Sequence, residues 1–595
     1  MNIFIDELKR LKGLEQSLQK KINTIYTLRL STALLSIAFF ILASVKADSV
    51  YVYPALGCSI LFILFVFQHT KAANELNKAQ CLIKINQSYI DRHNGDWGAF
   101  KDCGNEFMDS DHAYSRDLDI FGSNSLFQFI CCANTFFGRN HLAKLLKESN
   151  KNDASIKERQ GAIRELAAQV DFCRNFQCEE KLRGDGCDAP EKLIAYAEST
   201  AKLFKYGWLE GVFIGLTICS LLTISLLIMK IPIPTYIPTI VFLVQVIITL
   251  FSWKCNPILS GLHGMKSSLE TYRSLLVLIS AQDFKDKHLM QLKNELFKSE
   301  ASALIGLKKL DYITQAVNVK FIPPLYFMLN IVLLWDFHCV FELEAWKKQY
   351  GKHLSAWLET IGEFEAYISL AVIPQINTET TFPEFCTGEV KFSAKNLGHP
   401  LINTGKMVAN NIHMNNSIFI ITGSNMSGKT TMLRTVGINL VLAYAGAPVI
   451  AKSLECGVME VFTSMRIEDN LNSGISTFYA ELLRIKTMIQ FSVLKRPMIF
   501  LLDEIFRGTN SKDRIIGAKS VIGNLNKKWI IGIVSTHDFE LCDLENEDSV
   551  KIKNFHFTEY YVNDEIRFDY RLKSGRCNST NAKYLMRLAG IELKE

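Results

Sequence analysis

Apolar residues along this chain gather in long blocks. Leu30 to Val45 is uncharged for 16 residues and Ser49 to Phe67 for 19, and a second pair runs Gly211 to Met229 and Ile231 to Trp253. A helix that crosses a bilayer needs about 20 apolar residues. The pattern therefore predicts two transmembrane helical hairpins, 30–45 with 49–67 and 211–229 with 231–253. Two buried hairpins in a large soluble protein remain the alternative.

A fifth apolar run, Phe321 to Trp335, is only 15 residues long and contains Pro323, Pro324 and Asn330. Its length is below that of a span, so we expect a buried core helix there.

Topology follows from the short loops, because a hairpin returns the chain to the side from which it entered. All larger segments then share one side. The N-terminal arm is rich in basic residues: Lys9, Arg10, Lys12, Lys20, Lys21 and Arg29. Basic residues flank spans on the cytoplasmic side. We therefore expect a multi-pass protein of the inner (cytoplasmic) membrane, with about four spans and its other domains in the cytoplasm.

Outside the hairpins, residues 117–205 and 257–373 carry apolar positions at helical spacing, as at Leu142, Leu145 and Leu146. The segments 267–305 and 342–367 are amphipathic without internal proline, and we expect extended helices there. From Pro383 onward short β-rich runs alternate with helices, which predicts an α/β domain. The expected strands are 389–392, 417–422, 498–502, 529–535, 555–562 and 566–572.

A complete GxxxxGK[ST] loop follows the apolar run 417–421 and precedes a helical pattern. Such a loop wraps backbone N–H groups around phosphate oxygens, while its lysine and hydroxyl meet the β and γ phosphates and Mg²⁺. The predicted cofactors are ATP and Mg²⁺. The expected nucleotide-binding residues are Gly423, Ser424, Asn425, Met426, Ser427, Gly428, Lys429, Thr430 and Thr431.

Two acids end the apolar strand that begins at Met498. The carboxyl ends of buried parallel strands meet at the ligand-bearing edge of a sheet. We therefore expect Asp503 to hold Mg²⁺ together with Thr430, and Glu504 to polarise the attacking water. His537 directly follows another predicted strand, and we expect it to reach the γ-phosphate. The polar turn 507–511 is a candidate contact with a second subunit.

Length and charge constrain the remaining possibilities. A chain of 595 residues needs several domains, and a net charge of +6 does not by itself indicate a nucleic-acid binder. A basic face is available between residues 285 and 309, but interspersed acids favour a solvated helix surface. Its lysines are Lys285, Lys287, Lys293, Lys298, Lys308 and Lys309.

Four motifs in order carry a family resemblance: GSNMSGKTTMLRTVG, DNLNSGISTF at 469–478, LLDEIFRGTNS and STHDFE. Together they resemble the ATPase domain of the MutS family of DNA mismatch-repair proteins. Weaker likeness extends to 117–146 and 156–168. The resemblance implies a homodimeric ATPase in which Ser476 and Thr477 contact the γ-phosphate bound by the partner. ATP would close the two domains, and helical levers would turn closure into a clamp motion around DNA.

The chain also departs from that family. Met407 lies near the place where relatives stack an aromatic ring on adenine. The N-terminal region holds an apolar hairpin and no counterpart of the Phe-x-Glu element that reads mismatches. Direct mismatch recognition is therefore in doubt, and the second hairpin interrupts the core domain.

These observations predict a multi-domain chain, with an all-α core and lever region carrying two transmembrane hairpins, followed by an α/β ABC-type P-loop ATPase domain. The expected function is a membrane-anchored MutS-like ATPase with a role related to mismatch repair and with DNA as a candidate partner. The alternatives are an ATP-switched membrane scaffold for a protein partner and an ABC transporter-like ATPase. The expected units are 1–75 (first hairpin), 76–116 (linker), 117–205 (helical core), 206–254 (second hairpin), 255–377 (core and lever) and 384–595 (ATPase domain).

Overall fold

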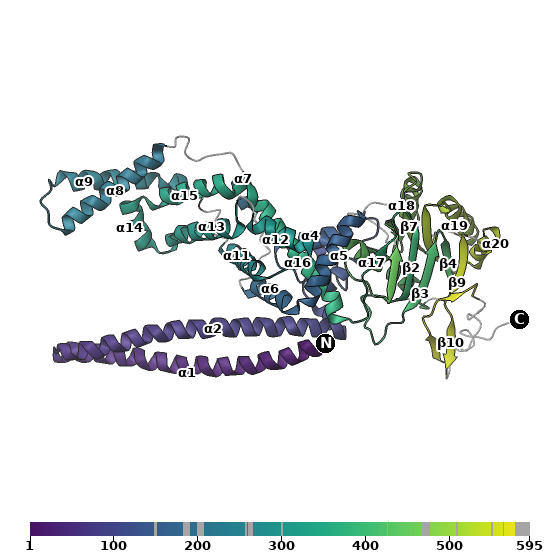
Figure 1. Cartoon of the computed structure of the whole chain (residues 1–595), viewed down its shortest axis with the longest axis horizontal. Coiled ribbons are helices and arrows are strands. Elements are labelled where there is room, and N and C mark those ends of the chain that lie inside the picture. Colours follow the sequence, from purple (N-terminus) through teal and green to yellow (C-terminus); the bar gives the residue numbers. More distant parts are fainter. Residues whose placement is uncertain are drawn as a thin grey trace.

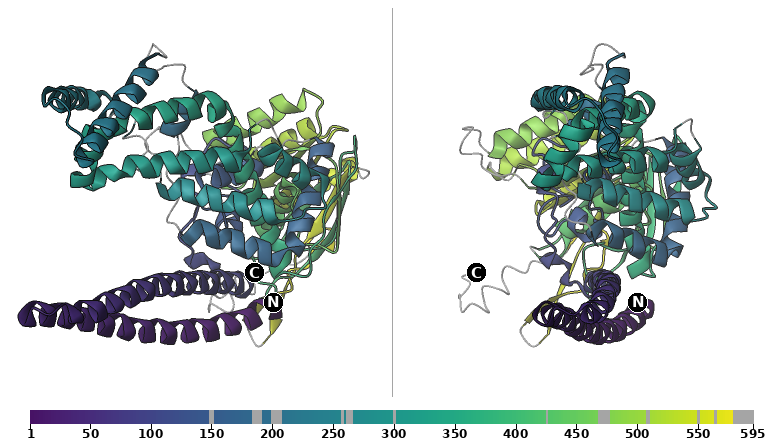
Figure 2. Two further views of the ribbon diagram at one scale, coloured as in Figure 1. Left: turned by 60° about the vertical axis from the view of Figure 1, so that its left-hand side comes forward. Right: turned by 90° about the vertical axis from the view of Figure 1, so that its left-hand side faces the viewer.

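The computed structural model describes residues 1–147, 152–182, 191–198, 208–255, 259, 266–298, 301–424, 426–466, 477–506, 510–548, 551–562 and 565–577. The molecule is elongated, with a sheet-containing domain at one end and two helical arms at the other (Figure 1). A helical body joins them. Both arms project from the same side of that body, as the turned views of Figure 2 also show.

The first arm is an antiparallel hairpin of α1 (Asn2–Lys46) and α2 (Val52–Asn94), joined through η1 (Ser49–Tyr51). In the half nearest the body, buried residues of α1 follow one another at intervals of seven: Phe4, Leu11, Leu18 and Ile25. The ring of Phe4 stacks on that of Tyr89, 4.5 Å away. A seven-residue repeat is the pattern by which two helices keep one seam in contact.

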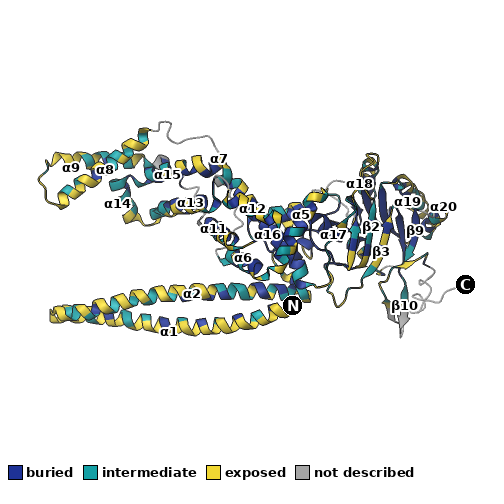
Figure 3. Ribbon diagram, viewed as in Figure 1, coloured by how far each residue is buried: buried dark blue, intermediate teal, exposed yellow. Residues whose placement is uncertain are grey.

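Beyond residue 30 the hairpin changes character, because most of its apolar side chains are exposed (Figure 3). We call residues 2–29 with 68–94 the stalk, and residues 30–67 the apolar tip. Since α2 continues unbroken to Asn94, the boundary expected at residue 75 falls inside a helix.

The helical body packs around α16, which is buried along most of its length and lies against α4 and α5. Its helices are α3 (Leu126–Ile130), α4 (Phe136–Lys147), α5 (Asp153–Ala168), α6 (Val170–Leu182), α7 (Glu191–Glu198), α11 (Lys266–Ala281), α12 (Lys287–Phe297), α13 (Ala303–Asn318), α15 (Trp335–Tyr350) and α16 (Leu354–Ile376), with the short η2 (Asp96–Ala99), η3 (Asn105–Phe107), η6 (Val319–Phe321) and η7 (Gly351–His353).

The extended helices expected over 267–305 and 342–367 are wrong, because both stretches are broken. Asp286 accepts the first N–H groups of α12 at 2.9 and 3.1 Å and so starts a new helix. At Gly351, a Cβ would lie 2.5 Å from the carbonyl oxygen of Ala197. Only glycine fits that approach, and η7 separates α15 from α16 there.

The second arm is built from α8 (Trp208–Ile228), α9 (Tyr236–Leu250) and α14 (Pro323–Leu333), with η4 (Phe251–Cys255) after α9. The helix expected over 231–253 is shorter than predicted, since prolines keep residues 231–235 out of it. At 15 residues, α9 is about 22 Å long against a hydrocarbon core of about 30 Å.

The fifth apolar run also differs from its prediction as a buried core helix. Five of the 11 residues of α14 are exposed, including Phe327 at 59% and Met328 at 55%, and only Asn330 is buried. It packs against α8 and α9 in the second arm. The prolines that argued against a span instead open the helix at its first turn, where proline is well tolerated.

Within the described residues, three helices are long and apolar enough to cross a membrane: α1, α2 and α8. The pair α13 and α14, bent by 114° at their junction, would make a fourth if it counted as one span.

The C-terminal region is an α/β domain with a six-stranded sheet in the order β12-β9-β4-β8-β7-β6, parallel except at β12. A second sheet has the order β1-β5-β2-β3, and β10 pairs with β11. The strands are β1 (Glu384–Phe385), β2 (Lys391–Leu397), β3 (Asn410–Asn415), β4 (Ile418–Thr422), β5 (Ser453–Cys456), β6 (Glu460–Ser464), β7 (Met498–Asp503), β8 (Ile530–Thr536), β9 (Ile552–His556), β10 (Glu559–Val562), β11 (Glu565–Phe568) and β12 (Lys573–Ser574).

The helices of this domain are α17 (Lys429–Ala445), α18 (Thr477–Ser492), α19 (Ser511–Leu525) and α20 (Leu544–Glu547), with the short η8 (Phe539–Asp543). Every residue of β4, β7 and β8 is buried, as in a parallel sheet covered on both faces. The alternation of strands and helices expected for this region is confirmed.

One helix joins the sheet to the body. Almost all of α17 is buried between them, and Arg159 of α5 donates to the carbonyls of Tyr444 and Ala445 at 2.8 and 3.2 Å. A guanidinium at the carboxyl end of a helix satisfies carbonyls that have no partner within the helix and complements its dipole. The helical body therefore fixes the carboxyl end of α17, the end opposite the glycine-rich loop.

Candidate nucleotide site

The glycine-rich loop lies where the central strand β4 turns into α17. Gly423 has φ +152° and Gly428 φ +104°, backbone conformations that favour glycine. A Cβ at Gly423 would lie 2.8 Å from the Ser427 hydroxyl oxygen, so the loop closes tightly on itself. Lys429 donates to the carbonyls of Gly423 and Ser424 at 2.9 Å each. Its ammonium is thereby centred in the loop. Asn425 lies outside the described residues.

Oxygen ligands for a divalent cation gather beside the loop. The hydroxyl of Thr430 donates to Asp503 Oδ2 at 2.7 Å, and Ser535 donates to the other oxygen of the same carboxylate. Mg²⁺ binds through one or two protein oxygens, substrate phosphates and waters. The Thr430–Asp503 pair fits that pattern. Among the described residues no group of three or more His, Cys, Asp or Glu side chains could hold a metal ion by itself.

Glu504 and His537 meet at the same edge of the sheet, directly after β7 and β8. The Nε2 atom of His537 is 3.0 Å from Glu504 Oε1 and 3.2 Å from the ammonium of Lys429. One ring nitrogen cannot accept a proton from lysine and donate to glutamate at once. His537 therefore has two alternative hydrogen-bond arrangements, one with Lys429 and one with Glu504.

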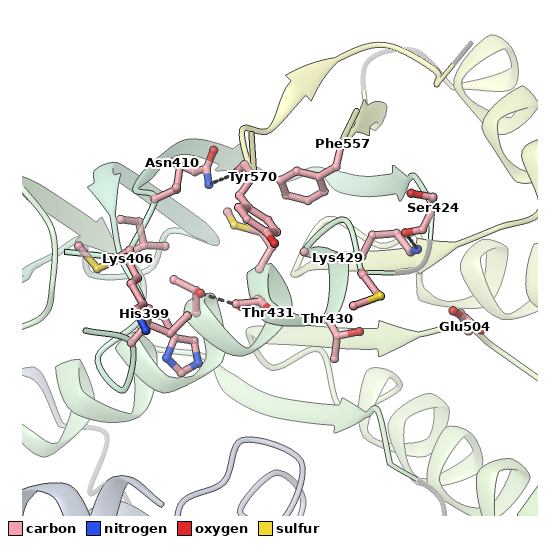
Figure 4. Close-up of a pocket in the computed structure, with 18 residues that line it drawn as sticks. His399, Lys406, Asn410, Ser424, Lys429, Thr430, Thr431, Glu504, Phe557 and Tyr570 are labelled. Atoms are coloured by element: carbon pink, nitrogen blue, oxygen red, sulfur yellow. Dashed lines mark hydrogen bonds between the residues drawn. The ribbon is translucent and has the colours of Figure 1, made fainter. Parts of the chain in front are cut away.

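A cavity of about 690 Å³ extends from this loop toward β2 and β3 (Figure 4). That volume is typical of a small-molecule site. One end is lined by Lys429, Thr430 and Glu504, and the other by His399 and Asn410. The two ends differ in chemistry: the first carries Lys429 and Glu504, and the second combines apolar and neutral polar side chains with Lys406.

Two side chains at the second end, Met407 and Tyr570, line the cavity wall. Met407 lies at the cavity wall, where the sequence suggested weak stacking. Tyr570 projects between Asn410 and the loop, and its ring would meet a Cβ added to Gly428 at 3.2 Å. Asn410 fixes this segment, donating to the Tyr570 carbonyl at 2.9 Å and accepting from the amide of Leu572 at 2.8 Å.

Tyr570 was not among the residues predicted from the sequence. It comes about 140 positions after the loop, and nothing in its own neighbourhood indicates a site. His399, in the cavity wall, is neutral at pH 7 because burial, assisted by the charge of Arg434, lowers its pKa to about 4.

A carboxylate of the helical body binds the strand that leads to the predicted signature segment. Asp117 is 1% exposed, and it accepts from the hydroxyl of Thr463, the amides of Met465 and Arg466, and the guanidinium of Arg484 at 2.7 to 3.1 Å. Residues 467–476, which include Ser476, lie outside the described residues and are flanked by these contacts.

Asp119 adds a second link of the same kind. It forms ion pairs with Arg434 of α17 at 2.8 Å and with Arg466 at 2.6 Å. The short segment 117–119 of the body therefore touches both the helix that follows the loop and the strand that leads to residue 467.

The predicted residues therefore fall into two groups. The structure brings Gly423, Lys429, Thr430, Asp503, Glu504 and His537 together around one loop, with Ser424, Met426, Ser427, Gly428 and Thr431 on or next to it. Ser476, Asn425 and residues 507–509 lie outside the described part of the chain.

Taken together, the parallel sheet and the loop at its carboxyl edge define an α/β domain with a phosphate-binding type of turn. Residues 419–593 match the family described as MutS domain V. The C-terminal part of the chain is therefore similar to the MutS family.

Similar curated proteins include three that are each named DNA mismatch repair protein MutS. The one from Persephonella marina is 34% identical over 241 residues, which are 39% of this chain and 27% of that protein. The one from Methanosarcina mazei is 30% identical over 263 residues (42% and 29%), and the one from Bacillus subtilis 31% over 290 residues (47% and 33%). The matched stretch thus spans about a third or less of the length of these relatives.

Proposed function

We propose that this chain is a membrane-anchored ATPase that acts as a dimer and couples ATP binding and hydrolysis to movement of its helical body, with DNA as a binding partner and a role related to mismatch repair. The observation that carries the ATPase proposal is the convergence of Lys429, Thr430, Asp503, Glu504 and His537 around one glycine-rich loop. Support also comes from the MutS domain V match.

Each side chain then has a defined task. ATP with Mg²⁺, when bound, supplies the phosphoryl group and a counter-charge for its oxygens. Lys429 would exchange its two loop carbonyls for phosphate oxygens, while Thr430 and Asp503 would hold the cation. Glu504 would orient a water molecule and accept its proton. The ring of Tyr570 would stack on the base in the role that Met407 cannot fill.

His537 connects nucleotide state to geometry in this proposal. Its Nε2 atom lies within hydrogen-bond distance of both Lys429 and Glu504. When Lys429 turns to phosphate, His537 is freed to hold Glu504, so the water-orienting group would be fixed only with nucleotide in place.

Anchoring in the membrane is supported by the exposed apolar surface of both arms. The apolar tip of the first arm and helices α8 and α9 of the second project from the same side of the body (Figure 1), as two anchors in one bilayer must. The basic residues of the stalk support a cytoplasmic location for the body. The stalk then holds the nucleotide site away from the bilayer.

Coupling between the nucleotide and the body would pass through segment 117–119. Arg434, on the helix that starts in the loop, and Arg466, at the entrance to the signature segment, both pair with Asp119. A partner subunit that contacts Ser476 across the dimer would thus transmit force to Asp117 and Asp119 of this segment. Movement of the body relative to the membrane is the expected output.

A second candidate, an ATP-switched scaffold for a protein partner, is favoured by one observation: the matches to repair proteins cover at most 47% of this chain. Binding of the detergent-purified protein to mismatched, matched and branched duplexes over a salt series separates the two. Binding that weakens steeply with salt supports the DNA proposal. ATP turnover without binding to any duplex favours the scaffold.

The ATPase proposal is tested by phosphate release from the Lys429→Ala variant. Lys528→Ala is the matched control, because Lys528 is exposed and precedes β8 at the opposite edge of the sheet. We expect turnover to vanish in the first variant and persist in the second. Equal turnover in both would refute the site. Extraction from membranes by carbonate without detergent would contradict the anchoring proposal.

A further inference from the structure

We propose that α14 is an interfacial helix, lying along the cytoplasmic boundary of the bilayer with its exposed apolar side in contact with lipid. This inference rests on the membrane location proposed above. It assigns a role to a segment that is too short to span and too exposed to belong to the core.

The surface of α14 is apolar and continuous with that of the hairpin. Its 11 residues include no charged side chain, and the nearest charges in sequence are Lys320 and Asp336. Phe327 and Met328 are more than half exposed, as is Leu222 on the neighbouring α8. Because α14 packs against α8 and α9, a bilayer around the hairpin would meet α14 as well.

The orientation of α14 fits a position along the boundary. The helix turns by 114° from α13, and in Figure 1 it crosses between the ends of α13 and α15 while α8 and α9 extend beyond it. At about 16 Å it covers only half of a hydrocarbon core. With the hairpin spanning the bilayer, a short helix set across the hairpin would lie along the plane of the membrane.

Hydroxyls of the hairpin lie against the carboxyl end of α14. Thr249 of α9 donates to the carbonyl of Asn330 at 3.1 Å, which also accepts the N–H of Leu334 at 3.0 Å. The hydroxyl of Thr217 of α8 lies 3.2 Å from the carbonyl of Leu333 and 2.9 Å from that of Phe213 in its own helix. The chain reverses at Leu334, which is buried and has φ +51°. These contacts join the carboxyl end of α14 to both helices of the hairpin.

Side chains that favour the membrane–water boundary frame the helix. Tyr326 donates to Asp336 Oδ2 at 2.6 Å, and the ammonium of Lys320 lies 5.9 Å from the centre of the Tyr326 ring. Trp335 donates to the carbonyl of Ala316 at 2.9 Å. Aromatic rings with a polar tip, beside a lysine, gather at the headgroup level. They mark the depth at which α14 would rest.

The consequence concerns α13 and α15, which continue from the two ends of α14. Both would be fixed at the membrane surface through it, in addition to the stacking of Phe213 on Phe337 between α8 and α15 at 4.5 Å. The helical body would then meet the bilayer at a surface as well as at two anchors.

Site-directed photocrosslinking tests this inference. Benzoylphenylalanine is placed singly at Phe327, at Leu222 in the proposed span, or at Ile305, which is 54% exposed at the far end of α13. The full chain is reconstituted into vesicles of phosphatidylethanolamine and phosphatidylglycerol and irradiated, and lipid adducts are quantified by mass spectrometry. Each variant is first checked for a single size-exclusion peak.

We expect the adduct yield at Phe327 to approach that at Leu222 and to exceed that at Ile305 by about tenfold, as for a side chain within the acyl boundary. A yield at Phe327 equal to that at Ile305, with strong labelling at Leu222, would overturn the interfacial helix alone. Background labelling at Leu222 as well would overturn the membrane location itself and the inference with it.

Discussion

Replacing Asp117 of the helical body should loosen the strand that leads to the signature segment of the α/β domain. Its carboxylate is 1% exposed and accepts four hydrogen bonds from Thr463, Met465, Arg466 and Arg484. Asp117→Ala leaves a guanidinium and three neutral donors without that partner.

The magnitude follows from burial. Removing one partner of a buried charged pair costs about 3–5 kcal/mol. Asp117→Asn keeps the shape and one good acceptor but turns an amide NH₂ toward a backbone N–H, so a loss of about 1.5–3 kcal/mol is expected. We therefore expect the local stability of this strand to be lowest in Asp117→Ala, higher in Asp117→Asn and highest in the wild type.

Hydrogen exchange followed by mass spectrometry measures the effect at the amides of Met465 and Arg466, which donate directly to Asp117. A loss of about 3 kcal/mol in local stability speeds exchange by roughly 100-fold. Asp111→Asn, an exposed acid six positions earlier, is the matched control. Unchanged exchange at both amides in Asp117→Ala would refute the role of this carboxylate.

Three further predictions concern the nucleotide site and the core. Glu504→Gln should bind ATP yet release no phosphate, so sustained turnover in that variant would contradict its role with water. Tyr570→Ala should weaken ATP binding by the roughly 1–3 kcal/mol of a base stack, measured by titration, while Tyr570→Phe retains it. Burial raises the pKa of Glu365 to about 7 and keeps that of its hydrogen-bonded partner Glu180 well above the usual range. The contribution of Glu365 to the free energy of unfolding should therefore be full below about pH 4.5 and fall by about 3 kcal/mol as pH rises through 7. Thermal unfolding from pH 5 to 8 should show this slope in wild type and a flatter profile in Glu365→Gln.

Most of the α/β domain could be predicted from the sequence because its signals are local. A buried parallel strand appears as a continuous apolar run, and the loop at Gly423 and the acids at Asp503 stand directly after such runs. The carboxyl ends of parallel strands lie at one edge of the sheet, so residues that follow these strands can be grouped without knowledge of other tertiary contacts. For this reason Lys429, Asp503 and His537 could be grouped although they lie far apart in sequence.

What escaped prediction depends on contacts between distant segments. Tyr570 enters the cavity because Asn410, 160 positions earlier, holds its backbone. The break between α15 and α16 at Gly351 depends on the close approach of the Ala197 carbonyl, which the helical periodicity of the sequence does not reveal. The run 321–335 is too short to span, which favoured a core helix, and its apolar content does not show which of its faces the rest of the chain covers.

The seven-residue seam of the stalk has a mechanical consequence. Two helices locked at Phe4, Leu11, Leu18 and Ile25 bend little, so the first arm behaves as a rod of about 40 Å between the body and its apolar tip. A rotation of about 10° at the base of such a rod displaces its tip sideways by about 7 Å, roughly two thirds of the width of one helix. With the tip held in lipid, the bilayer would resist that displacement, and the viscosity and tension of the membrane would enter the energetics of each nucleotide cycle.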